Sequence, residues 1–213
     1  MRAPEQPSRV ILAVVNLKGG TAKTTSAAFL AHALHETGWR VLGVDADPQR
    51  SLLDWSAESP AGWPFPVVGL ATRMLARDLG GITGDHNAIV IDTPPLEEQA
   101  GIVRAALLAA THVIVPVAPT PIEYRRLAAV RNEVEQSAGG RPDGEPPAVS
   151  VLITRAVSGA SSTNVWREAM TEDGLHVLKV PVTRLERYSQ AYGDDIAQAS
   201  DSAYGDAIWE LFG

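Results

Sequence analysis

The 213-residue chain contains no cysteine. Disulfide bonds and thiolate metal sites are therefore excluded, and stability has to come from a packed hydrophobic core. The chain is long enough to bury such a core within one domain. We expect one domain over residues 1–213, with a polar N-terminal tail over residues 1–8 and an exposed glycine- and proline-rich loop over residues 138–147.

Long apolar runs and a surplus of positive charge are also missing. No apolar run reaches the roughly 20 residues that span a bilayer, and the polar start, MRAPEQPSR, lacks the apolar centre of a signal peptide. We therefore expect a cytoplasmic protein that does not attach to membranes. The net charge is −7, so any binding to DNA needs a local basic patch, or a dimer that concentrates one.

Short apolar segments alternate with helical patterns along the whole chain. This alternation predicts an α/β fold, namely a doubly wound, mostly parallel sheet with helices on both faces. The predicted strands are 10–15, 40–45, 65–70, 88–92, 112–117, 148–154 and 176–182. The predicted helices are 26–36, 52–57, 72–79, 99–110, 122–137, 163–172 and 202–212.

Residues 10–25, VILAVVNLKGGTAKTT, carry the strongest functional pattern. An apolar strand, a small-residue loop and a helix, with Lys23 and Thr24 at the junction, form the arrangement that cradles a triphosphate. Loop N–H groups face the anion, the lysine adds charge near the β and γ phosphates, and the threonine hydroxyl can bind Mg²⁺. The general pattern GxxxxGK[ST] fails, because Leu17 and Ala22 occupy its two glycine positions.

Two other predicted strands end in carboxylates. Asp45 and Asp47 follow the second strand, at the sheet edge where open α/β sheets bind ligands. Asp92 ends the strand AIVID, which is the Walker B pattern of a carboxylate that reaches Mg²⁺. An aspartate at a strand end can also be simply solvated, but the phosphate loop beside it favours the magnesium interpretation.

The loop KGGTAKT resembles the deviant Walker A motif of the ParA/MinD ATPases, whose usual form is KGGxGKT. The resemblance continues over nearly the full chain, in the order VDADPQRSLLDWS, AIVIDTPP, VIVPVAPTPIEY, VLITR and VPVTRLERYSQAYG. The chain is most similar to the small ParF-like partition ATPases, a branch that lacks the N-terminal DNA-binding extension of longer relatives. The resemblance therefore implies a doubly wound P-loop ATPase of the deviant Walker A group.

The same resemblance implies a working cycle. ATP and Mg²⁺ would lock two copies into a sandwich homodimer, which would bind nonspecific DNA and a small centromere-binding adaptor. Slow, partner-stimulated hydrolysis would reset the dimer, and the protein would associate with the bacterial nucleoid during plasmid or chromosome segregation.

Individual roles also follow from the resemblance. Lys23 would hold the β and γ phosphates, Lys18 would reach the partner subunit's nucleotide, and Asp47 would orient the attacking water. The implied magnesium site consists of Thr24, Asp45 and Asp92. The implied nucleotide pocket consists of Gly19, Gly20, Thr21, Ala22, Lys23, Thr24, Thr25, Thr154, Arg155, Pro181 and Val182, the last four lying where relatives form the adenine pocket.

One position departs from the family motif. Ala22 stands where the family usually has glycine, next to Lys23. If this position has a positive φ, alanine costs on the order of 1 kcal/mol there. Because Lys23, Thr24, Asp47 and Asp92 are all retained, we still expect an active ATPase.

Candidate DNA contacts are weaker. Arg184 and Arg187, late in the chain, are the first choice, and the arginines of the predicted helix 122–137 (Arg125, Arg126 and Arg131) are the second. A solvated face is the alternative for both groups. His32 and His35 have no evident acidic or histidine partner, so we expect core or surface roles rather than a metal site.

Two further functions stay open. A MinD-like ATPase that positions cargo on membranes is disfavoured, because membrane-targeting helices have a basic polar face, whereas the apolar residues near the C-terminus have Asp201, Asp206 and Glu210 as neighbours. A regulatory nucleotide-binding module in another complex would keep the fold without the cycle.

Overall fold

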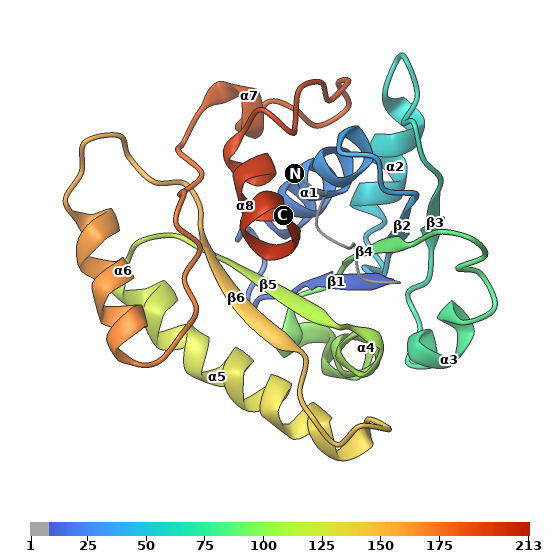
Figure 1. Cartoon of the computed structure of the whole chain (residues 1–213), viewed down its shortest axis with the longest axis horizontal. Helices are drawn as coiled ribbons and strands as arrows, with labels where there is room; N and C mark the ends of the chain where they lie inside the picture. The colour runs from blue at the N-terminus through green and yellow to red at the C-terminus, as the bar shows by residue number, and fades with distance from the viewer. Residues whose placement is uncertain (1–8) are drawn as a thin grey trace.

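The computed structural model describes residues 9–213, so the predicted tail over residues 1–8 lies outside the described residues. Six parallel strands form one sheet in the order β3-β2-β4-β1-β5-β6 (Figure 1). The strands are β1 (Val10–Val14), β2 (Val41–Asp45), β3 (Val67–Gly69), β4 (Ala88–Asp92), β5 (His112–Val117) and β6 (Ala148–Ile153). The predicted doubly wound parallel sheet is confirmed.

Helices cover both faces of this sheet. One face carries α1 (Lys23–Glu36), α2 (Ser51–Glu58) and α8 (Ala203–Phe212). The other carries α3 (Leu75–Leu79), α4 (Leu96–Ala109), α5 (Pro121–Ser137) and α6 (Ser162–Glu172). Two short elements complete the chain, η1 (Ala138–Gly140) and α7 (Glu186–Ser189).

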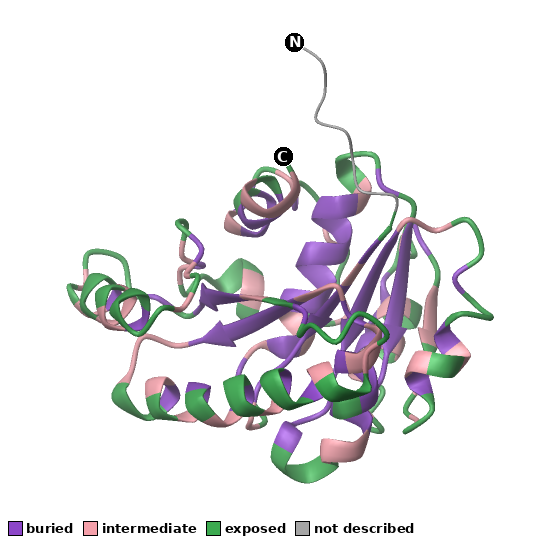
Figure 2. Ribbon diagram, turned by 60° about the horizontal axis from the view of Figure 1, so that its bottom comes forward, coloured by how far each residue is buried: buried purple, intermediate pink, exposed green. Residues whose placement is uncertain are grey.

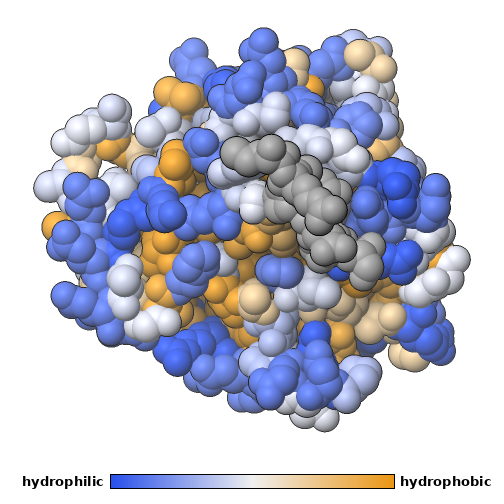
Figure 3. Space-filling model, viewed as in Figure 1, coloured by the Kyte–Doolittle hydropathy of each residue, from blue (hydrophilic) through white to orange (hydrophobic). Residues whose placement is uncertain are grey.

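The hydrophobic core has two layers, one on each face of the sheet, because the strands bury side chains on both faces. Figure 2 shows the central strands and α1 buried between more exposed helices, as continuous apolar strands in a parallel sheet require. Hydrophilic side chains cover most of the face seen in Figure 3, with apolar groups in the hollow between α8 and α5. The strand order places β1 and β4 side by side, and their carboxyl ends define the site described below.

The predicted strand over residues 176–182 was wrong. This segment runs beside β6 but forms only isolated parallel bridges, Val151 to Val177 and Ala156 to Thr183. The carbonyl of Leu178 accepts a hydrogen bond from the Arg167 guanidinium, and Pro181 has no N–H to donate to a ladder. The side chain of Arg167 thus replaces a backbone donor at the edge of the sheet.

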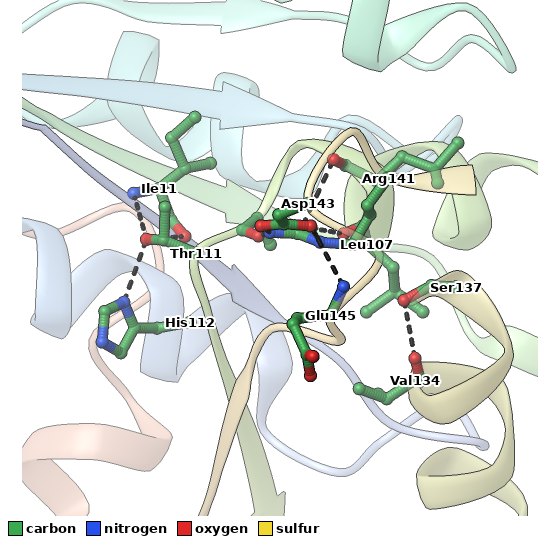
Figure 4. Close-up of polar contacts among 11 residues, drawn as sticks. Ile11, Leu107, Thr111, His112, Val134, Ser137, Arg141, Asp143 and Glu145 are labelled. Atoms are coloured by element: carbon green, nitrogen blue, oxygen red, sulfur yellow. Dashed lines mark hydrogen bonds and ion pairs between the residues drawn. The ribbon is translucent and has the colours of Figure 1, made fainter. Parts of the chain in front are cut away.

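The predicted loop over residues 138–147 is exposed over most of its length, but it begins with η1 and is anchored. Arg141 donates to the carbonyls of Leu107, Leu108 and Ala110, the shortest bond being 2.6 Å to Ala110 (Figure 4). Its guanidinium also pairs with Asp143. These carbonyls lie at the end of α4, where a cation complements the helix dipole.

Candidate functional site

The carboxyl ends of three neighbouring strands meet at one edge of the sheet. Asp92 of β4 lies in register with Val14 of β1 on one side and Asp45 of β2 on the other. The phosphate loop follows β1, so local sequence patterns on three strands converge on one place. A cavity of about 520 Å³ opens there. It is lined by Gly19, Gly20, Thr21, Ala22, Lys23, Thr24, Thr25, Asp47, Gln49, Ser51, Pro95 and Glu98.

The start of α1 is left open toward this cavity. Ala22 is the N-cap residue, with φ +67° and ψ +28°, and no side chain caps the helix. The first N–H groups of a helix need acceptors, and an anion supplies them where no capping side chain does. Gly20 also has a positive φ of +69°. Ala22 therefore occupies the left-handed conformation in which glycine would be unstrained.

Lys23 points into the loop. The residue is only 6% exposed, and its Nζ donates to the carbonyl oxygen of Lys18 at 3.0 Å. Burial lowers the pKa of Lys23, although the charge of Asp92 opposes that shift. A buried ammonium beside a carbonyl cradle is placed to meet the oxygens of a phosphate.

Thr24 and Asp92 form the metal-type corner of the cavity. The Thr24 hydroxyl donates to Asp92 Oδ2 at 2.6 Å, whereas Oδ1 is buried and has no hydrogen-bond partner among the described residues. Burial raises the pKa of Asp92 to about 7. An unpartnered carboxylate oxygen beside a hydroxyl is a set of hard oxygen ligands that suits Mg²⁺, so the residues fit this ion.

Asp45 and Asp47 have different surroundings. Asp45 is buried, and its two oxygens accept the backbone N–H groups of Asp47 at 3.0 Å and Leu53 at 2.9 Å. Asp47 is half-buried and lines the cavity, where its carboxylate accepts the N–H of Gln49. Asp45 therefore fixes the turn that presents Asp47, and burial raises the pKa of Asp45.

Lys18 lies at the rim. Its ammonium pairs with Glu97 in the first turn of α4, and 41% of its side chain is exposed. The start of α4 is also tied to the loop, because Leu96 N–H donates to Asn16 O and Glu97 N–H to Leu17 O. The two lysines of the loop thus differ in burial, one enclosed and the other facing outward.

A second cavity of about 120 Å³ adjoins the first and shares Ala22 and Thr25 with it. Thr154, Arg155 and Val182 line this cavity, where an adenine pocket was predicted, while Pro181 does not line it. The Thr154 hydroxyl is buried without a partner among the described residues. Beyond the phosphate loop, the structure therefore brings three of the four predicted pocket residues together.

The predicted DNA contacts other than the half-buried Arg126 are exposed, and they differ in position. Arg184 lines the second cavity, whereas Arg187 lies outside it, over the Tyr188 ring at 5.2 Å. In the second group, Arg126 pairs with Glu123, Arg131 pairs with Glu135, and Arg125 is exposed.

Several lining residues were not predicted from the sequence. Tyr188 and Tyr204 line the second cavity, and Tyr204 is almost wholly buried, with its hydroxyl 3.4 Å from Ser26 Oγ. Ser26 and Tyr204 are 178 positions apart in the chain, so no local pattern points to their contact. Glu98, which lines the first cavity, lies six positions after Asp92 and could have been inferred from that position.

Comparisons with known proteins agree with this geometry. Residues 12–197 match the family profile described as the CobQ/CobB/MinD/ParA nucleotide binding domain. Maintenance of carboxysome distribution protein A from Gloeobacter kilaueensis is 37% identical over 113 residues, covering 53% of this chain and 51% of that protein. The protein of the same name from Halothiobacillus neapolitanus is 27% identical over 189 residues, covering 87% and 85%. The chain thus spans about half of the first relative and most of the second.

Solved structures share the fold. Cobyrinic acid a,c-diamide synthase from Mycobacterium smegmatis, solved with ADP and magnesium, has a TM-score of 0.74 at 25% identity over 95% of this chain and 94% of that chain. A plasmid partition protein from Borrelia burgdorferi, bound to AMPPNP, has a TM-score of 0.74 at 19% identity over 96% of this chain and 98% of that chain. At that identity the second similarity concerns the fold alone.

Proposed function

This chain belongs to the CobQ/CobB/MinD/ParA family of nucleotide-binding domains, and on that premise we propose that it is an ATP-driven DNA-partition ATPase. ATP with Mg²⁺ occupies the 520 Å³ cavity and stabilises a two-fold sandwich dimer. The dimer binds nonspecific DNA at the nucleoid, in the cytoplasm, and a small centromere-binding adaptor. Slow hydrolysis, stimulated by the adaptor, returns the protein to monomers.

The observation that carries the proposal is the difference between the two lysines of one loop. Lys23 is enclosed and would serve the phosphates of its own subunit, whereas Lys18 is partly exposed, pairs with Glu97 and would exchange that partner for the nucleotide of a second subunit. Thr24 and Asp92 would hold Mg²⁺, which supplies charge stabilisation to the phosphates when bound. Asp47 lines the same cavity and would orient the attacking water.

The decisive experiment measures DNA binding. A gel-shift titration with ATP and with ADP, at two salt concentrations, should show binding only with ATP, without sequence preference and falling steeply with salt. Arg184→Ala/Arg187→Ala should weaken DNA binding and flatten its salt slope at saturating ATP, and ATP affinity is measured on the same variant because Arg184 lines the second cavity. Arg125→Ala/Arg131→Ala removes the same charge from α5 and tests the second candidate group, so the comparison identifies which of the two patches contacts DNA. A parent protein that binds no DNA with ATP at low salt would refute the proposal.

A second candidate is favoured by the two relatives named for carboxysome distribution. In this second function the same cycle positions a protein-bounded cargo instead of a replicon. A deletion strain separates the two, because the first predicts lower plasmid or chromosome retention and the second predicts uneven spacing of a protein compartment.

Positioning on a membrane and a purely regulatory role have less support. The apolar side chains of Tyr204, Ala207 and Ile208 on α8 are buried in the core, and its Glu210 accepts the Lys179 N–H, so this helix docks onto the body. Among residues 9–213 no helix is both long and apolar enough to cross a bilayer. Turnover measured with and without DNA and adaptor would identify a regulatory module, which would show no stimulation.

A further inference from the structure

One side chain that is distant in sequence contacts the phosphate loop. Arg155, which follows β6, donates from Nη1 to the carbonyl oxygen of Gly20 at 2.9 Å. The two residues are 135 positions apart. Arg155 lines the 120 Å³ cavity but not the 520 Å³ cavity, so its guanidinium contacts the loop outside the space proposed for the phosphates.

The geometry of the peptide gives this bond a consequence. A trans peptide directs its C=O and N–H in opposite directions, and the described chain has no cis peptide. A donor that holds the Gly20 carbonyl therefore directs the Thr21 N–H away from Arg155. The positive charge also polarises the peptide, which makes that N–H a stronger donor to an anion.

The contacted loop is strained. Its Ala22 has a φ of +67°, where alanine is disfavoured, whereas Gly20 adopts its φ of +69° without strain. Arg155 itself has a φ of +54°. Its backbone is fixed on both sides, because Thr154 N–H donates to Val117 O at 2.8 Å and Ala156 N–H donates to Val182 O at 3.1 Å. Strained residues persist where neighbouring bonds determine them, and they concentrate at functional sites.

We propose that Arg155 is a positioning residue for the phosphate loop, which holds Gly20 to Ala22 in the conformation that binds phosphate before nucleotide arrives. This role acts through the loop backbone and differs from the adenine contact that the family resemblance implies for Arg155. It rests on ATP binding by the proposed ATPase, but not on DNA, adaptor or cargo. Measurements of nucleotide binding to the protein alone can therefore refute this inference while the partition proposal stands. Conversely, a protein that binds no DNA would refute the partition proposal and leave this inference intact.

The first test compares ligands with and without a base. Calorimetric or competition titrations would use MgATP, MgADP and inorganic tripolyphosphate on the parent, Arg155→Ala and Arg155→Gly. All three dissociation constants should rise by roughly fivefold to tenfold, as expected for one partly exposed, charge-assisted hydrogen bond. Glycine accepts a positive φ, so Arg155→Gly removes the side chain without leaving backbone strain at position 155.

The matched control is Arg9→Ala. Arg9 also donates from its guanidinium to a glycine carbonyl, that of Gly84 at 3.1 Å, but it precedes β1 at the opposite end of the sheet. This variant should bind all three ligands as the parent does. If Arg155 variants lose affinity for ATP and ADP but keep it for tripolyphosphate, Arg155 is a base contact and the proposal is wrong.

The second test measures coupling between Arg155 and Ala22. Ala22→Gly should tighten ATP binding by a few-fold in the parent and by a larger factor in the Arg155→Ala background. Without Arg155 the free loop relaxes, so ATP binding has to restore the whole of the strained conformation at Ala22. In steady state, Arg155→Ala should raise KM while kcat at saturating ATP stays near the parent's. Equal effects of Ala22→Gly in both backgrounds would show that Arg155 does not act on the strained loop.

Discussion

The Thr24 hydroxyl donates a 2.6 Å hydrogen bond to Asp92 and so joins the first turn of α1 directly to the end of β4. The bond uses Oδ2 and leaves the buried Oδ1 of the same carboxylate without a partner among residues 9–213. Two motifs that are 68 positions apart in sequence thus form one corner, built around one unsatisfied carboxylate oxygen. An oxygen in this state is costly unless a ligand satisfies it.

Thr24→Val should abolish the contribution of magnesium to ATP binding. Valine keeps the shape of threonine but removes the hydroxyl, so the metal loses one oxygen ligand and Asp92 loses its donor. We expect ATP affinity in Mg²⁺ to fall by about tenfold, equivalent to about 1.4 kcal/mol. Titrations with Mg²⁺ and with EDTA measure the effect. Thr24→Ser, which keeps the hydroxyl, should behave like the parent, and an unchanged response of Thr24→Val to EDTA would contradict the prediction.

The parts of this site that could be predicted are local in sequence. The lysines, glycines and Thr24 lie within residues 18–24, and Asp92 ends a strand with a continuous apolar pattern, so reasoning from chain order finds them. The parallel sheet follows from the alternation of strands and helices in the same way.

The remainder depends on tertiary packing. The contact of Arg155 with Gly20 joins segments that no periodicity connects. The apolar pattern of residues 176–182 predicts a strand, yet Arg167 occupies the Leu178 carbonyl and only bridges form. Side chains of a neighbouring helix decide that outcome, and a pattern read along one segment does not contain them.

Asp47→Ala should separate ATP binding from ATP hydrolysis. Asp47 lines the cavity from the turn after β2, whereas the loop N–H groups and Lys23 supply the contacts to phosphate. We expect ATP affinity within about twofold of the parent and turnover reduced by at least about a hundredfold, as for the loss of a group that orients a nucleophile. The variant should accumulate as an ATP-bound dimer by size-exclusion chromatography. Turnover at the parental rate would exclude Asp47 from the reaction.

His32 should make the protein less stable in mild acid. Its ring is buried between Trp63 and Phe65, and its Nδ1 lies 2.9 Å from the Ala28 carbonyl. Burial lowers the pKa of His32 below its usual 6.5. The unfolded chain therefore binds the proton first, and stability is lost as the pH falls from 6.5 through the lower pKa of the folded state.

Denaturant unfolding between pH 7.5 and pH 5 measures this loss, which is at most about 1.4 kcal/mol per pH unit for one group. His32→Phe should flatten the slope in part, because burial also lowers the pKa of His112 and its contribution has the same sign. His35→Phe, on the less buried side of α1, is the matched control. An identical slope in His32→Phe and the parent would exclude His32 as the cause.

Lys18→Gln should bind ATP but fail to dimerise or hydrolyse it. The enclosed Lys23 meets the phosphates within the subunit, so affinity for ATP should change by about twofold or less. The Lys18 ammonium that the substitution removes would act only in the dimer, where it would offset the negative charge of the nucleotide bound by the partner subunit. Analytical ultracentrifugation with ATP and a phosphate-release assay measure the two losses.

In the isolated chain Lys18 pairs with Glu97, but both side chains are more than a third exposed, and such a pair is worth about 1 kcal/mol or less. Glu97→Gln should therefore fold normally and dimerise with ATP at least as well as the parent.

Mixing two inactive variants decides whether Lys18 acts in trans. In a heterodimer of Lys18→Gln with Asp47→Ala, the site of the first subunit keeps its own Asp47 and receives Lys18 from the second. That one site is complete only if the lysine crosses the interface, and turnover then reappears on mixing. If Lys18 acts within its own subunit, each site lacks one of the two groups, and the mixture stays inactive although heterodimers form. A Lys18→Gln protein that dimerises and turns over ATP by itself would remove the sandwich mechanism, because no charge would then need to cross between subunits.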